Sequence, residues 1–79
     1  MNFKEWLVVE KKYTMKSAND ASSRVKRVIG LTGNNKISFN TINILEKNTD
    51  FKKLSPTVKS QLRIAVRLYL VWQENVYIK

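Results

Sequence analysis

The segment from Ser55 to Lys79 constrains the fold most, because apolar residues recur along it at helical spacing. Ser55 and Pro56 predict where this helix starts, since serine caps helices and proline is tolerated at the first helical position. One apolar face contains Val58, Leu62, Ala65, Tyr69, Trp72 and Val76, and a second apolar row contains Ile64, Leu68 and Val71. Two apolar faces predict a helix that lies between neighbours rather than on a surface.

A stripe of three cations occupies the remaining arc of this helix. Lys59, Arg63 and Arg67 stand at every fourth position, so their side chains share one face. Like charges at this spacing repel one another slightly, and an external anion would relieve the repulsion. The stripe is the first candidate binding surface.

Two amphipathic helices are predicted in the first part of the chain. Asn2 and Glu5 give a capping-box pattern at the start of a short helix. Its apolar edge consists of Phe3, Trp6 and Leu7. The second helix is capped by Thr14 or Ser17 and ends at Gly30 or Gly33. Its apolar face consists of Ala18, Ala21, Val25, Val28 and Ile29.

The second helix carries a polar, basic face opposite its apolar one. This face contains Lys16, Asn19, Ser23 and Arg27, and it is flanked by Arg24 and Lys26. Small polar side chains between cations allow a phosphate backbone to come close, which makes this face a second candidate binding surface. The alternative is an ordinary solvated helix face.

A third helix is expected after the polar turn at residues 33–36. Ser38 is its expected cap, and the residues expected to turn inward are Phe39, Ile42 and Leu45. Ile37 and Ile44 are β-branched and leave a strand as an alternative. We favour the helix, because a lone strand would have no partner elsewhere in the chain.

The link before the long helix is predicted to be short and basic. After a break at residues 48–50, Phe51 and Leu54 anchor a short turn from which Lys52 and Lys53 point outward. Four helices joined by short links predict an all-α fold, a compact four-helix bundle with the long C-terminal helix at its centre.

The composition favours an anionic partner. The 79 residues include 15 Lys and Arg against six Asp and Glu, which gives a net charge of +9 and a pI of about 10.1. The basic residues are spread from Lys4 to Lys79, as in many nucleic-acid-binding domains, although charge for solubility alone is the alternative. Acidic partner surfaces would be attracted as well.

Cysteine and histidine are absent from the sequence. The chain therefore has no disulfide framework and no thiolate or imidazole ligands for a metal, and we expect neither a metal nor a cofactor. The N-terminus does not have the pattern of a signal peptide, and no apolar run has the length of a membrane span. We therefore expect a cytoplasmic protein with no membrane attachment.

The order of these signals resembles the N-terminal core-binding domain of tyrosine recombinases and phage-type integrases, a SAM-like four-helix domain. The Phe-x-x-Trp-Leu opening of that family is matched by Phe3–Leu7, and its cap before the second helix is matched by Tyr13–Ser17. Leu54, Ser55 and Pro56 match the turn that leads into the family's last helix, here followed by residues 60–69. The resemblance spans essentially the whole chain but consists of packing and capping patterns.

The resemblance implies a DNA-binding domain over residues 1–79 that contacts duplex DNA through its second and fourth helices. It also implies no enzyme activity, because the family's catalytic arginines, histidine and tyrosine belong to a separate C-terminal domain. The expected DNA contacts are Lys16, Asn19, Arg24, Arg27, Lys52, Lys53, Lys59, Arg63 and Arg67. The prediction of DNA binding through both helices depends on their presenting one continuous positive surface, with the cations neither scattered over unrelated sides of the domain nor neutralised by internal carboxylates.

The alternative function is a small phage or plasmid protein-interaction module that docks on an acidic partner. It is suggested by apolar residues near the C-terminus, namely Leu70, Val71, Tyr77 and Ile78. The second apolar row of the last helix also leaves self-association open. Trp6 and Trp72 could stack on single-stranded bases, but their helical spacing favours a packing role.

Overall fold

The described residues of the computed structural model, 1–33 and 35–78, form an all-helical domain. The helices are α1 (Phe3–Val9), α2 (Met15–Thr32), α3 (Thr41–Lys47), α4 (Thr49–Lys52) and α5 (Pro56–Ile78). The predicted all-α fold is confirmed, and the strand alternative around Ile37 and Ile44 is wrong. The short turn expected before the long helix forms a single helical turn, α4, in addition to the four expected helices.

Three helices begin at the caps that the sequence predicts. Asn2 Oδ1 accepts a hydrogen bond from the Glu5 N–H at 2.8 Å at the start of α1. Thr14, rather than Ser17, caps α2, because its Oγ1 accepts from the Ser17 N–H at 3.1 Å. Ser55 Oγ accepts from the Val58 N–H at 3.3 Å at the start of α5. These hydrogen bonds satisfy N–H groups that have no partner within the helix.

Helix α2 ends at Gly33 and passes through Gly30 without a break. Gly33 has a φ of 68° and its N–H donates to Ile29 O, as expected for a left-handed helix terminus. Glycine suits this position because a side chain would strain the left-handed backbone.

The predicted start of the third helix is wrong. Helix α3 begins at Thr41, and Phe39, which was expected to turn inward, is 76% exposed. The buried Thr41 hydroxyl accepts from the Ser38 N–H at 2.8 Å, and the Thr41 N–H donates to Ser38 O at 3.0 Å. These paired hydrogen bonds close a turn before the helix and leave Phe39 outside it. Ile42 and Leu45 lie against or within the core as expected.

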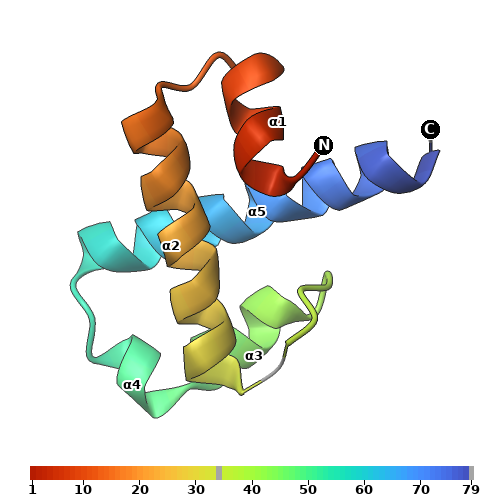
Figure 1. Cartoon of the computed structure of the whole chain (residues 1–79). Helices are drawn as coiled ribbons and strands as arrows, with labels where there is room; N and C mark the ends of the chain where they lie inside the picture. Colours follow the sequence, from red (N-terminus) through yellow and green to blue (C-terminus); the bar gives the residue numbers. More distant parts are fainter. Residues whose placement is uncertain (34, 79) are drawn as a thin grey trace.

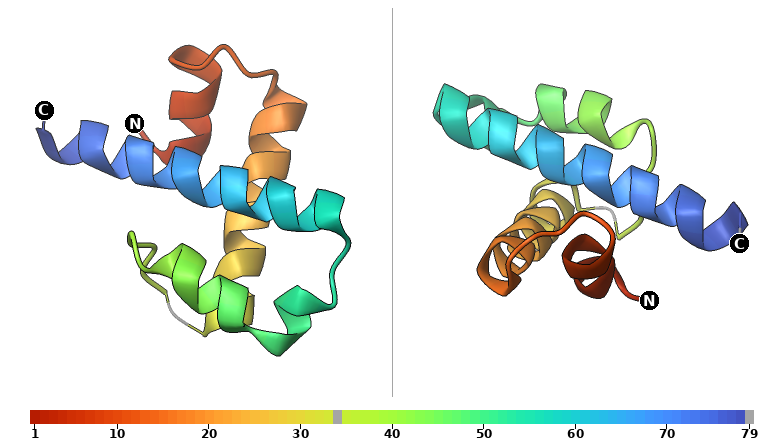
Figure 2. Two further views of the ribbon diagram at one scale, coloured as in Figure 1. Left: turned by 180° about the vertical axis from the view of Figure 1, so that it is seen from behind. Right: turned by 90° about the horizontal axis from the view of Figure 1, so that it is seen from above.

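The helices form two layers that cross at α2 and α5. The view from above in Figure 2 shows α1 and α2 on one side and α5 with α3 on the other, and Figure 1 shows α2 crossing in front of α5. The long helix α5 packs on α1, α2 and α3, which is the central position predicted for it. The largest fully buried side chains are Phe51, Leu7, Leu45, Leu62, Val28 and Val66.

An aromatic cluster joins the N-terminus to α5. The ring of Phe3 lies 5.1 Å from that of Tyr69 and 5.9 Å from that of Trp72, measured between centroids. Trp72 Nε1 donates to Met1 O at 3.1 Å, and Trp6 is buried beside Phe3. Both tryptophans therefore pack in the fold, as their spacing indicates.

The faces of α5 differ in part from the prediction. Val66 is fully buried although it belongs to neither predicted apolar row. Ile64 and Val71, from the second row, are 52% and 40% exposed, so part of this row faces solvent instead of the core. The predicted contributions of the Val76, Tyr77 and Ile78 side chains lie outside the described part of the chain.

Candidate nucleic-acid interface

The basic face of α2 points away from the rest of the domain. Ala18, Ala21, Val25 and Val28 are buried, and α2 packs on α1, α3 and α5. Helical periodicity places Lys16, Asn19, Ser23 and Arg27 on the opposite side, and all four are exposed. The face predicted from the sequence is therefore present and accessible to solvent.

The cations of α2 are not neutralised from within the domain. Lys16, Arg24, Lys26 and Arg27 form no salt bridge and no side-chain hydrogen bond with any other residue in the described ranges. Arg24 and Arg27 line a shallow hollow of about 230 Å³ together with Ser23 and Asp20. Asp20 lies within this face, four residues from both Lys16 and Arg24, and contributes one negative charge; the net charge of the face remains positive.

The stripe on α5 is arranged differently, because Arg63 already has a carboxylate partner. Its Nε donates to the Glu46 carboxylate of α3 in a half-exposed ion pair. The guanidinium also lies 5.4 Å from the centre of the Phe51 ring, and the Lys59 ammonium lies 5.9 Å from the same centre. Arg63 thus joins α5 to α3 and α4.

The contact between Arg63 and Glu46 shifts the pKa values of both side chains. The hydrogen bond from Arg63 lowers the pKa of Glu46, desolvation opposes the shift, and the charges of Arg63 and Lys59 lower it further. The hydrogen bond to Glu46 likewise raises the pKa of Arg63. The expectation that the α5 stripe is free of internal carboxylates is therefore wrong for Arg63.

The remaining candidate residues lie in two further places. Arg67 borders a hollow between α5 and the start of α3, beside Phe39 and Val71. Lys52 and Lys53 are exposed at the end of α4, and the prediction that they point outward is confirmed.

The expected single positive surface is divided into two. Lys16 and Arg27 lie on the side of α2 opposite its buried residues, with Arg24 and Lys26 flanking them, whereas the α5 stripe lies beside α3 and α4. The hydrophobic core separates them, because the apolar side of α2 must face α5. All four α2 cations are without an ion-pair partner in the described ranges, whereas Arg63 in the α5 stripe is paired with Glu46.

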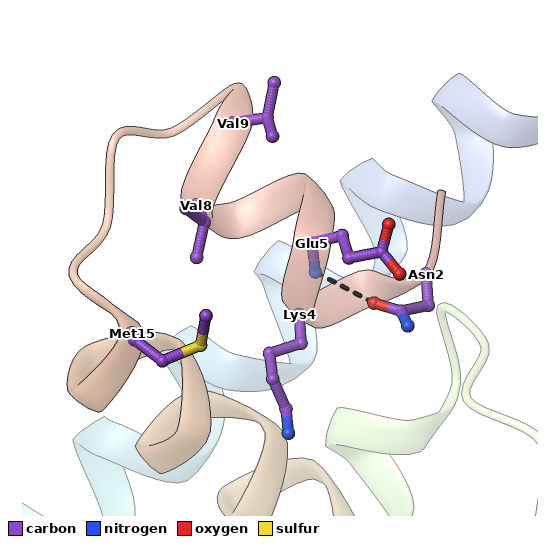
Figure 3. Close-up of a pocket in the computed structure, with 6 residues that line it drawn as sticks. All are labelled: Asn2, Lys4, Glu5, Val8, Val9 and Met15. Carbon is purple, nitrogen blue, oxygen red and sulfur yellow. Dashed lines mark hydrogen bonds between the residues drawn. The ribbon is translucent and has the colours of Figure 1, made fainter.

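A hollow of about 470 Å³ lies between α1 and the start of α2, with Val8, Val9 and Met15 as its apolar wall (Figure 3). Its polar residues are Lys4, Glu5 and Asn2, and Asn2 Oδ1 is engaged in the cap of α1. This lining holds no nucleophile and base in contact.

In residues 1–33 and 35–78, no three acidic, histidine or cysteine side chains gather where they could hold a metal ion. Within that same part of the chain, every helix is too short or too polar to cross a membrane.

Comparisons with known proteins give no relative, because no protein-family model, curated protein or solved structure matches this chain. The resemblance to recombinase core-binding domains therefore rests on the sequence motifs and stays a prediction.

Proposed function

We propose that this protein binds double-stranded DNA through its phosphate backbone, with the basic face of α2 as the principal contact. The observation that carries the proposal is a set of cations on and beside this face that have no ion-pair partner in the described ranges: Lys16, Lys26 and Arg27, which are exposed, and Arg24, which is half-buried. The role would match that of the non-catalytic core-binding part of a tyrosine recombinase or integrase, the family that the sequence resembles.

The physical basis of the proposal is counterion release. Each cation that neutralises a phosphate releases condensed counterions from the DNA, which favours binding at low salt. The small side chains of Asn19 and Ser23 stand between the cations and leave room for a sugar–phosphate chain. Contacts of this kind position a protein on DNA without specifying a base sequence.

The cations of α5 and α4 have a secondary role in the proposed DNA binding. Lys59 and Arg67 extend the positive potential, and Lys52 and Lys53 add to it from α4. Arg63 contributes less than its place in the stripe suggests, because Glu46 offsets its charge. Reversal of the α2 charges should therefore weaken DNA binding more than reversal of the same number of charges elsewhere.

The decisive experiment compares two double charge reversals in a gel-shift titration at low salt. In the test variant, Lys16→Glu and Arg27→Glu reverse the centre of the α2 face. In the matched control, Lys4→Glu and Lys47→Glu reverse two exposed cations on α1 and α3. We expect the test variant to lose duplex retention and the control to keep most of it, with the circular dichroism of both unchanged. Equal retention by the two variants would refute the proposal.

The salt dependence gives an independent measurement. If the four α2 cations each engage a phosphate, log affinity should fall with log salt concentration with a slope of about −3.6. A slope close to zero would exclude backbone binding. The same titration with single-stranded DNA and with RNA tests whether the duplex is preferred.

Docking on an acidic protein is the second candidate function, because the same unpaired cations would serve it. A pull-down from cell extract after nuclease treatment distinguishes DNA binding from docking on a protein. A partner retained at high salt without nucleic acid would favour protein docking, whereas loss of all partners on nuclease treatment would favour DNA.

A further inference from the structure

Apolar side chains lie on the side of α5 that faces solvent. We define the α5 patch as Phe39, Ile64, Arg67, Val71 and Glu74. Phe39, Ile64 and Val71 are 76%, 52% and 40% exposed. A hollow of about 400 Å³ lies within the patch, between Phe39 and α5. A group of exposed apolar side chains with charged residues at its edge is typical of a surface that binds a partner.

The charges of the patch suggest what that partner is. Arg67 and Glu74 line the same hollow, on either side of Leu70 and Val71, and have opposite signs. They form no salt bridge with each other or with any other residue in the described part of the chain. The patch therefore presents one unpaired positive group and one unpaired negative group along a single helix.

This arrangement is complementary to itself. When two copies of α5 pack antiparallel around a twofold axis between Leu70 and Val71, position 67 of one copy lies opposite position 74 of the other. Arg67 of each copy then meets Glu74 of its mate, so two ion pairs form at once. The symmetry is that of an isologous dimer, in which one surface serves both partners.

We propose that a second copy of this chain docks on the α5 patch, with the two α5 helices antiparallel across a twofold axis. Val71 lies nearest the axis and packs on its counterpart, while Phe39 of each copy covers the apolar side of the other α5. The surface is small, so the dimer is a weak one of the transient class.

This inference is independent of the proposed function. The basic face of α2 lies on the side of that helix opposite α5, so dimerisation leaves it exposed. Self-association is measured without DNA, and its failure would leave the DNA-binding proposal untouched.

The test is sedimentation equilibrium of the full chain at about 10 µM to 1 mM, a range that covers weak association. Arg67→Glu and Glu74→Arg are each expected to weaken the dimer at least about tenfold, because each replaces two attractive contacts by two repulsive ones. The double variant, Arg67→Glu with Glu74→Arg, restores the attraction and should return to within about threefold of the original.

Two further variants complete the test. Phe39→Ser removes the most exposed apolar group and should also weaken the dimer, with no loss of helicity. Lys53→Glu is the matched single reversal outside the patch, and dimerisation should be unaffected by it. A chain that stays monomeric throughout this range, or a double variant that remains as weak as the single ones, would overturn the proposal.

Discussion

Replacement of Asn48 should destabilise the domain more than its position in a link suggests. Its Nδ2 donates to Leu31 O at 2.7 Å, and its Oδ1 accepts from the Phe51 N–H at 2.9 Å. One side chain thus caps α4 and ties the α3–α4 link to the C-terminal end of α2. The Leu31 carbonyl belongs to the last turn of α2, where carbonyls have no partner within the helix.

The expected cost of Asn48→Ala follows from these two hydrogen bonds. Loss of a capping side chain costs about 1 kcal/mol. Loss of the hydrogen bond to the part-buried Leu31 carbonyl costs about 1 kcal/mol more. The sum of about 2 kcal/mol is a large share of the roughly 4–12 kcal/mol that holds a domain of this size folded.

Asn48→Ser separates the two contributions. Serine keeps an oxygen that can cap α4 but has no amide to reach Leu31, so its expected cost is about 1 kcal/mol. Asn43→Ala is the matched control, because Asn43 is exposed on α3 and its side-chain amide donates to Asn40 Oδ1, also exposed, at 3.3 Å. Its expected effect is below about 0.5 kcal/mol.

Urea unfolding followed by far-ultraviolet circular dichroism measures all three variants at a concentration where the chain is monomeric. In a thermal scan, Asn48→Ala should lower Tm by about 10 °C. If Asn48→Ala were no more destabilising than the Asn43 control, the link would not depend on this side chain. If serine were as costly as alanine, the contact with Leu31 would carry no free energy of its own.

Two other predictions concern α5 and its ion pair. Val66→Ala should lower the free energy of unfolding by about 2–3 kcal/mol, because Val66 is fully buried. Ile64→Ala, at an exposed site, should lower it by less than about 0.5 kcal/mol. Similar urea midpoints for the two variants would contradict the observed faces of α5. The lowered pKa of Glu46 stabilises the fold above the ordinary carboxyl pKa, and this stabilisation is lost as pH falls through the folded-state value. The difference in urea midpoint between the original chain and Glu46→Gln should therefore be present at neutral pH and shrink toward zero below about pH 4, and a pH-independent difference would argue against the ion pair as its source.

Features decided by neighbouring residues were predictable from the sequence. Asn2 and Ser55 were identified as caps, and Thr14 as one of two candidates, because a capping side chain bonds a backbone N–H within its own first turn. The apolar face of α2 was likewise predictable, since helical spacing alone places Ala18, Val25 and Val28 together.

The start of α3 shows where this local reasoning fails. Ser38 is a good capping residue, and Phe39, Ile42 and Leu45 have suitable spacing, yet the helix begins at Thr41. Burial of Thr41 and Ile37 fixes the turn between them, and that burial depends on helices distant in sequence. Local preference is weak compared with such packing.

The sequence by itself determined the helices, most of their apolar faces and the large positive charge, because these follow from spacing within one turn and from composition. Only the tertiary structure decided which cations are free. Glu46 and Arg63 lie on different helices, and their ion pair exists because α3 packs beside α5. The same packing buries Val66 and leaves Phe39 and Val71 exposed. Contacts between distant segments depend on how the helices cross, and no single helix encodes that geometry in its own sequence.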